Sequence, residues 1–441
     1  DRLSNDEVLK SARESGVEFV RLQFTDIFGI MKNVAITIEE LERVLREGII
    51  FDGSSVNGSV RDEETDMYLK PDPSTFVVYP WRTSSGLDGR LICDVYTLNG
   101  EPFYGDPRWI LRREISDIEA MGYTVKLSPE CEFFLFHTDE KGRPTTETHD
   151  NAGYYDLAPV DLGEAARRDM AVALKQMGFL IEASHHEIAP GQHEIDLQPE
   201  DVLYAADGIE TVKTVVRVIA QRHGLHATFM PKPVYDIAGS GLHMNVSLFK
   251  DGRNALYDRD DKNGLSDDAY CFIGGLLRHS HALTAIVNPT VNSYKRLISG
   301  YDSPLYITWS VKNAESFVKV PPKRGMSTSI EMRSPDPSCN PYLAAAAILQ
   351  AGADGIRNSM VPPPSIDENS AEDAVERLED NTGSLPVSLS GALDALRGDE
   401  VIKSVLGDYV YAKFSEAKMV EWEEYSKRIT PWEIEQYLTK F

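Results

Sequence analysis

Two hydrophobic periods run along this chain, and the change from one to the other falls near residue 100. The first part alternates apolar and polar residues over short runs that Pro and Gly separate, which is typical of strands. Ahead of these runs, residues 5–14 carry a helical pattern that Gly16 ends. We therefore predict a small mixed sheet with one or two helices. Its strand-like runs are 18–24, 31–37, 75–81 and 90–98.

From about residue 108 onward, longer helical patterns alternate with strand-like runs, and the segment 100–107 is the expected boundary. This alternation predicts a larger, curved sheet backed by helices. Helical patterns cover 107–121, 162–178, 201–223, 266–287 and 341–357, and more helices are expected within 386–441. Strand-like runs cover 124–137, 179–184, 193–197, 225–229, 242–249 and 329–334. The polar, Pro-rich stretch 362–373 predicts a surface loop.

The composition is that of an ordinary folded protein. The 441 residues are 42% hydrophobic and 26% charged, and this length favours two domains of unequal size. We find neither an apolar run of membrane-spanning length nor a signal peptide, so we expect a soluble, cytoplasmic protein. The net charge of −25 argues against nucleic acid and anionic membrane as partners. The four cysteines form no CxxC pair, which argues against disulfides and a zinc finger.

The candidate metal-binding residues are several glutamates and one histidine. Glu130 and Glu132 stand two apart in an apolar run, so their side chains leave the same face of a strand. Two such carboxylates repel unless a cation lies between them. Oxygen ligands with one imidazole suit Mg²⁺ or Mn²⁺ better than zinc. We predict a site for two or three divalent ions that handles an anionic substrate. The other candidate ligands are Glu187, Glu194, His243 and Glu331, each of which taken alone also fits a surface acid or a structural histidine.

Several common motifs are absent from the sequence. Neither GxxxxGK[ST] nor GxGxxG occurs, so a bound nucleotide would not be held by either common phosphate-binding loop. The segment HHEIAPGQHE is not HExxH, because Pro190 stands where the second histidine would be. The absence of GxSxG weakens a serine hydrolase hypothesis.

Seven segments occur in an order that resembles type I glutamine synthetase, in its shorter form. The resemblance extends from about residue 15 to the end of the chain. The segments are FDGSS at 51–55, SPECEFFLF at 128–136, HHEIAPGQHEID at 185–196, FMPKP at 229–233, GSGLHMN at 239–245, NSYKRLISGYDSP at 292–304 and EMRSPDPSCNPYLAAA at 331–346.

This resemblance implies an α+β fold, with a β-grasp domain at 1–104 and a catalytic domain at 105–441. It implies a ligase that uses ATP and Mg²⁺ or Mn²⁺ to join ammonia to the γ-carboxylate of glutamate through γ-glutamyl phosphate. Metal ions neutralise phosphate oxygens in such phosphoryl transfers. The resemblance also implies a homo-oligomer of two stacked hexameric rings. In such an assembly Asp52 would reach a neighbouring copy's site and take a proton from ammonium.

The family motifs imply a role for each matching residue. One ion would be held by Glu132, Glu187 and Glu194, and another by Glu130, His243 and Glu331. The catalytic residues would be Asp52, Asp302, Arg296 and Arg333. Substrate would be bound by Glu132, Tyr154, Gly239, His243, Arg296 and Arg333, and nucleotide by Asn245, Ser247 and Lys319.

Some positions depart from the family pattern while all six predicted metal ligands are retained. The departures gather around the nucleotide phosphates, the adenine and the ammonium site, and they are Pro199, Ala238, Asp302, Ala314, Lys319 and Ser329. Three functions therefore stay open. They are a glutamine synthetase, a γ-glutamyl ligase for another amine, and a weakly active or inactive paralogue with a regulatory or binding role.

Overall fold

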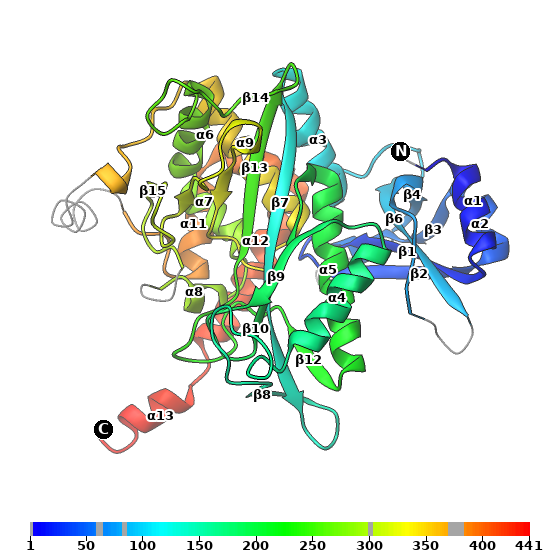
Figure 1. The fold of residues 1–441 in the computed structure, drawn as a ribbon, viewed down its shortest axis with the longest axis horizontal. Coiled ribbons are helices and arrows are strands. Elements are labelled where there is room, and N and C mark those ends of the chain that lie inside the picture. Colours follow the sequence, from blue (N-terminus) through cyan, green and yellow to red (C-terminus); the bar gives the residue numbers. More distant parts are fainter. Residues whose placement is uncertain (1–2, 59–64, 82–85, 299–302, 369–382) are drawn as a thin grey trace.

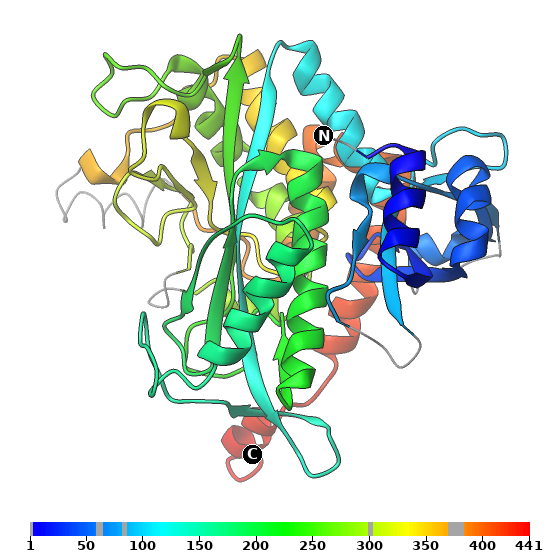
Figure 2. The ribbon, with the colours of Figure 1, turned by 45° about the vertical axis from the view of Figure 1, so that its right-hand side comes forward.

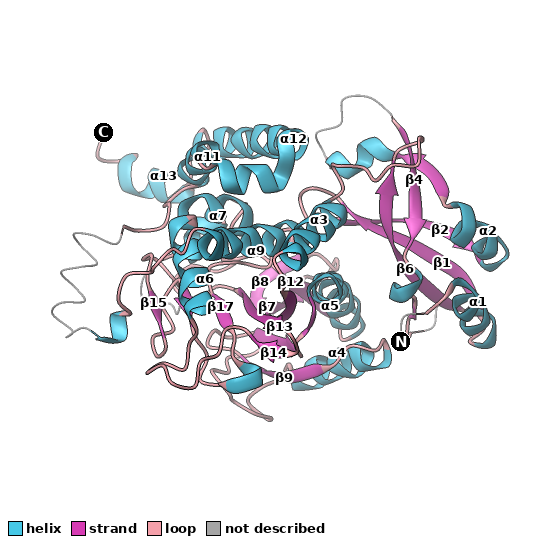
Figure 3. Ribbon diagram, turned by 90° about the horizontal axis from the view of Figure 1, so that it is seen from above, coloured by secondary structure: helices cyan, strands magenta, loops and turns pink. Residues whose placement is uncertain are grey.

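The computed structural model describes residues 3–58, 65–81, 86–298, 303–368 and 383–441. These residues form two sheets, a small one near the N-terminus and a large one that runs through the main body of the molecule (Figure 1). Helix α5 lies next to β7 on the side of the large sheet that faces the small domain (Figure 3). The α+β fold class, with its small domain and its larger sheet backed by helices, agrees with the sequence-based prediction.

The small sheet has the strand order β2-β1-β6-β4-β3, with β5 paired to β6. Only the central pair β1–β6 is parallel. Its strands are β1 (Val17–Thr25), β2 (Met31–Thr37), β3 (Ile49–Asp52), β4 (Asp66–Pro71), β5 (Val77–Val78) and β6 (Leu87–Tyr96). The sequence did not predict β3, β4 or the adjoining helix α2 (Leu41–Glu47), and the run 75–81 forms only the short β5.

Helix α1 (Asn5–Glu14) begins and ends where its sequence predicts. Ser4 and Glu7 form a reciprocal capping box at its N-terminus. Gly16 follows the helix with a φ of 68°, a conformation that is costly for residues with a Cβ. Local chemistry alone therefore fixes both ends of this helix.

The large sheet has the order β15-β16-β17-β13-β7-β10-β9, and every described pairing in it is antiparallel except β15–β16. Strand β7 also pairs with β8, β11 and β12, and β14 extends the edge of β13. The strands are β7 (Thr124–Thr138), β8 (Pro144–Thr148), β9 (Ile181–His186), β10 (Gln192–Leu197), β11 (Glu200–Asp201), β12 (Leu225–Thr228), β13 (Leu242–Lys250), β14 (Arg253–Asn254), β15 (Trp309–Ser310), β16 (Val318–Lys319) and β17 (Ile330–Met332).

Most helices of the large domain match the predicted segments, with one correction. The pattern at 266–287 forms two helices, because the backbone turns at His279 between them. The helices are α3 (Pro107–Ala120), α4 (Glu164–Gln176), α5 (Val202–Arg222), α6 (Asp267–Arg278), α7 (Ser280–Val287), α8 (Ser293–Arg296), α9 (Pro341–Arg357), α11 (Leu389–Gly398), α12 (Glu400–Ser426) and α13 (Pro431–Tyr437). Across the described ranges, every helix is too short or too polar to cross a bilayer.

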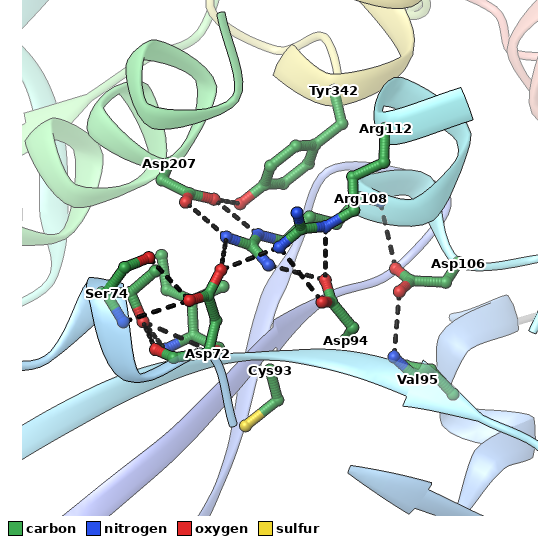
Figure 4. A network of polar contacts seen from close by, with 12 residues as sticks. Asp72, Ser74, Cys93, Asp94, Val95, Asp106, Arg108, Arg112, Asp207 and Tyr342 are labelled. Atoms are coloured by element: carbon green, nitrogen blue, oxygen red, sulfur yellow. Dashed lines mark hydrogen bonds and ion pairs between the residues drawn. The ribbon is translucent and has the colours of Figure 1, made fainter. Parts of the chain in front are cut away.

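A buried guanidinium joins the small sheet to the large domain (Figure 4). Arg108, on α3, makes a bidentate contact with Asp207 of α5, with N–O distances of 2.9 and 2.8 Å. It also donates to Asp94 of β6 at 2.6 Å and to Asp72, which follows β4, at 2.9 Å. Tyr342 of α9 donates to Asp207 at 2.8 Å. Arg108 therefore joins α3 to α5, to β6 and to the residue after β4, and α9 is attached through Asp207.

We expect Arg108→Met to destabilise the protein by about 3–5 kcal/mol, because it leaves the buried Asp207 without its cation and leaves Asp72 and Asp94 with Arg112 alone. Chemical denaturation followed by circular dichroism measures this loss. Arg43→Met is the matched control, since Arg43 pairs with Glu40 at 2.8 Å where both side chains are about half exposed. That change should cost less than about 1 kcal/mol. Equal losses in the two variants would contradict the role given to Arg108.

His279, at the break between α6 and α7, makes stability depend on pH. Its Nδ1 lies 2.6 Å from Asp399 and its Nε2 lies 3.0 Å from Asp354. Burial alone would lower the pKa of His279, but these hydrogen bonds outweigh burial and raise it. The stabilisation is therefore complete below the unfolded pKa of about 6.5 and is lost as pH rises through the higher folded pKa. Denaturation at pH 6 and pH 9 should show a larger difference between wild type and His279→Gln at pH 6.

Candidate active site

Acidic side chains cover one face of the large sheet because of its pairing register. Glu132 of β7 lies opposite Glu194 of β10, and Glu130 lies opposite both Asp196 of β10 and His243 of β13. Alternation along each strand sends these five side chains to the same face. They line a cavity of about 1000 Å³. The cavity wall also includes Glu187, Glu331, Arg333, Asn245, Ser247, Lys319 and Tyr154.

The first candidate metal group is Glu130, His243 and Glu331. Nδ1 of His243 lies 3.1 Å from Glu130 and 3.7 Å from Glu331. One potential ligand atom from each residue lies within 4.8 Å of the others. Two carboxylates and an imidazole suit Mn²⁺ or Mg²⁺. The structure thus brings together the three residues that the family motifs assign to one ion.

The second candidate metal group lies at the β10 end of the cavity. The structure brings Glu132, Glu187 and Glu194 to one cavity, as predicted. A cluster whose potential ligand atoms lie within 4.8 Å of one another also forms at this end, from Glu194, Asp196 and His185. Sequence reasoning missed Asp196 and His185. The signal was available, because Asp196 stands two residues after Glu194, the same spacing that drew attention to Glu130 and Glu132.

The electrostatics of this end fit a divalent cation. Burial and the charge of Glu187 raise the pKa of Glu132 to about 8. Burial, Asp196 and Glu132 raise the pKa of Glu194 well above its usual range. These carboxyls are harder to ionise because they desolvate and repel one another. A bound cation would relieve the repulsion, so the donor set fits Mg²⁺ or Mn²⁺.

Gln192 is a further residue that sequence reasoning missed. Its Nε2 donates to Oε2 of Glu132 and to the carbonyl oxygen of Gly239, both at 3.0 Å. The backbone N–H of Gly241 donates to the same Glu132 oxygen at 2.8 Å. These donors fix Oε2, so Oε1 of Glu132 is the oxygen turned toward His243, at 3.8 Å from its Nε2.

The two arginines predicted to be catalytic, Arg296 and Arg333, lie at different distances from the cavity surface. Arg333 lines the cavity and forms an ion pair with Glu331. Arg296 is buried behind it and donates to the carbonyl oxygens of Ser334 at 2.8 Å and Arg333 at 3.1 Å. Gly239 packs on this layer, where a Cβ would lie 2.3 Å from the carbonyl oxygen of Pro231.

The residues predicted to bind nucleotide lie along the cavity wall. Asn245 donates to Glu130 at 2.9 Å, and the hydroxyl of Ser247 donates to the carbonyl oxygen of Thr328 at 2.8 Å. Lys319 Nζ lies 3.7 Å from Glu331. Four departures from the family pattern, Pro199, Ala314, Lys319 and Ser329, also line this cavity.

Among the predicted catalytic residues, Asp52 does not join this group within one chain. Asp52 belongs to the small domain, where it accepts from the backbone N–H of Ser54 at 3.0 Å, and it is not part of the cavity wall. Asp302 lies outside the described residues. Tyr154 does line the cavity; its ring stacks on Tyr155, with 4.0 Å between the ring centroids.

The chain matches the glutamine synthetase catalytic domain over residues 104–437 and the glutamine synthetase β-grasp domain over residues 16–98. It belongs to the glutamine synthetase family. A glutamine synthetase of Clostridium saccharobutylicum is 53% identical over the whole of both chains. One of Staphylococcus aureus is 50% identical over 99% of each. The predicted family, fold class and glutamine synthetase assignment are therefore confirmed.

Solved structures are similar to this chain over nearly its whole length. A GmaS/ADP complex is 34% identical, with a TM-score of 0.88, over 98% of this chain and 99% of that one. Plasmodium falciparum glutamine synthetase, at 24% identity and a TM-score of 0.87 over 99% of each chain, shares the fold.

Replacing one carboxylate of the acidic cavity should weaken Mn²⁺ binding without lowering the stability of the metal-free protein. Because the pKa of Glu132 is about 8, its neutral form is already favoured near pH 7 without a cation. We expect Glu132→Gln to leave the melting temperature without metal unchanged or higher, and to remove most of the rise that Mn²⁺ causes in wild type. Glu182→Gln is the control at the cavity rim and should keep the full rise. Loss of stability without metal, or a full Mn²⁺ response in Glu132→Gln, would contradict this account.

Proposed function

We propose that this glutamine synthetase uses ATP to join ammonia to the γ-carboxylate of L-glutamate through γ-glutamyl phosphate. The observation that carries the proposal is the retained acid and imidazole face, including the cluster Glu130, His243 and Glu331. It occurs in a chain that is 53% identical to a glutamine synthetase over its whole length. The two metal groups lie side by side on one sheet face, which suits a reaction between two anions.

Divalent ions, when bound, neutralise the oxygens of the phosphates and of the glutamate carboxylate. Cationic side chains of the cavity wall would neutralise the same oxygens. Arg333 and Lys319 both contact Glu331, so positive charge lies immediately beside the metal ligands. A guanidinium can bind an oxyanion through two parallel N–H groups, and Arg333 is the residue we assign to the transferred phosphoryl group. Arg296, which binds the carbonyl oxygen of Arg333, holds that segment in place.

The amine would enter at the end of the cavity lined by Tyr154 and Glu187. A carboxylate and an aromatic face both attract a cation such as ammonium. We assign the removal of its proton to Asp52 of a neighbouring copy, because Asp52 is not part of its own chain's cavity wall. This assignment requires a homo-oligomer, which we propose to be two hexameric rings. We propose that the enzyme acts in the cytoplasm.

ATP would bind toward the wall that contains Ser247, Ala314 and Ser329. The short side chains at 314 and 329 offer no cation to the phosphates, so Lys319 and the metal ions would carry more of that charge. A γ-glutamyl ligase for a different amine would use the same phosphorylation step, and the choice of amine separates the two functions.

Phosphate release with Mg²⁺, ATP and glutamate tests the proposal. We expect release that depends on ammonium, with methylamine, ethanolamine and a polyamine giving at most about a tenth of that rate, roughly 1.4 kcal/mol in transition-state binding. Arg333→Gln should lower kcat by about 100-fold, as loss of a charge-stabilising donor does elsewhere. Turnover with another amine and not with ammonium would replace the proposed substrate. No turnover with any amine, while Mn²⁺ still binds, would overturn the enzymatic function.

A further inference from the structure

The reverse face of β9 and β10 carries a second polar layer. His186 and His193 are cross-strand partners, and alternation turns them away from the face that carries His185 and Glu194. Both rings are fully buried and lie 4.8 Å apart. A buried polar layer directly behind metal ligands calls for a structural reason, because burying such groups is costly unless they are paired.

Asp150 is the centre of this layer. Its Oδ1 accepts from the backbone N–H of Gly191 at 2.9 Å and of Ala152 at 3.3 Å, and from Nε2 of His186 at 3.0 Å. Its Oδ2 accepts from the backbone N–H of Leu162 at 3.2 Å. One buried carboxylate therefore closes its own loop, 150–163, and attaches it to the turn that joins β9 to β10.

His186 extends these contacts to a predicted metal ligand. Its Nδ1 lies 2.7 Å from the carbonyl oxygen of Glu187, and its Nε2 faces Asp150. Both partners are acceptors, so both ring nitrogens donate. The backbone N–H of Tyr155 donates to the carbonyl oxygen of His186 at 3.2 Å. The ring of His186 thus lies between the loop 150–163, which carries Tyr154, and the backbone of Glu187.

This layer is not a metal site of its own, although it contains four side chains with potential ligand atoms within 4.8 Å of one another. They are Asp150, Asp161, His186 and His193. Arg167 donates to Nδ1 of His193 at 2.8 Å and pairs with Asp161 at 2.8 Å. The remaining nitrogen of His193 therefore carries the proton, and it faces Gly163, where a Cβ would lie only 2.5 Å away.

We propose that Asp150 and His186 are positioning residues for the active site. They hold the turn 187–192, and with it Glu187 and Gln192, at a fixed place relative to the loop that carries Tyr154. Groups behind metal ligands set ligand orientation and therefore metal affinity. The inference deepens the proposed function and rests on it for the identity of the site, but its first consequence is on metal binding.

Mn²⁺ binding to the full chain, followed by electron paramagnetic resonance of the free ion, tests the proposal. Asp150→Asn and His186→Gln should each raise the Kd for Mn²⁺ by about 10-fold. The Kd for Mn²⁺ of the double variant should lie within about twofold of the larger of the two single-variant Kd values. The effects are not additive because both changes break the same hydrogen-bonded pair. Saturating Mn²⁺ should restore kcat while the metal concentration needed for half activity stays high. A variant that is only less stable would not combine a normal kcat with a raised metal concentration for half activity.

Asp161→Asn is the matched control, because Asp161 is a buried acid of the same layer that pairs with Arg167 and has no described contact with the turn 187–192. It should lower the melting temperature and leave the Kd for Mn²⁺ unchanged. An unchanged Kd in Asp150→Asn, or an equal rise in Asp161→Asn, would overturn the proposal. If wild type binds Mn²⁺ but turns over no amine, the proposed function fails and the Kd comparison still decides the positioning role.

Discussion

The backbone pairing of β10, β7, β13 and β17 is the constraint on which the site depends. Hydrogen bonds between these strands fix Glu132 beside Glu194 and Glu130 beside His243, whatever the side chains would prefer. A slip of one residue would turn Glu130 to the opposite face of the sheet. The carboxylates stay together because the sheet holds them there, against their mutual repulsion.

The rest of the molecule offsets the cost of that concentration of negative charge. Cations lie beside the acids on the cavity wall, where Arg333 and Lys319 both contact Glu331. Amide donors from Gln192 and Gly241 stabilise one oxygen of Glu132. The same principle joins the domains, where several aspartates share Arg108 and Arg112 between the small sheet and the long helices (Figure 4). In both places a buried charge is stabilised by groups of opposite charge or by hydrogen-bond donors.

The sequence predicted what depends on local pattern. Period-two alternation identified Glu130 and Glu132, and a helical pattern followed by Gly16 identified α1. It could not predict that Arg296 would face backbone carbonyls, because that orientation depends on a segment 37 residues away in the chain. Nor could it divide the helical pattern at His279, whose partners are Asp354 of α9 and Asp399, the residue between α11 and α12. Those features are tertiary, and only folding brings their parts together.

Strand β7 is one continuous element of 15 residues that carries both Glu130 and Glu132, which we propose to bind different ions (Figure 2). The two contributing residues are therefore separated by one pleat repeat, about 7 Å of stiff backbone. Loops around the rim can diverge freely among related enzymes and alter which molecules enter. The backbone distance between Glu130 and Glu132 is different, because the strand sets it and no single substitution would lengthen or shorten it.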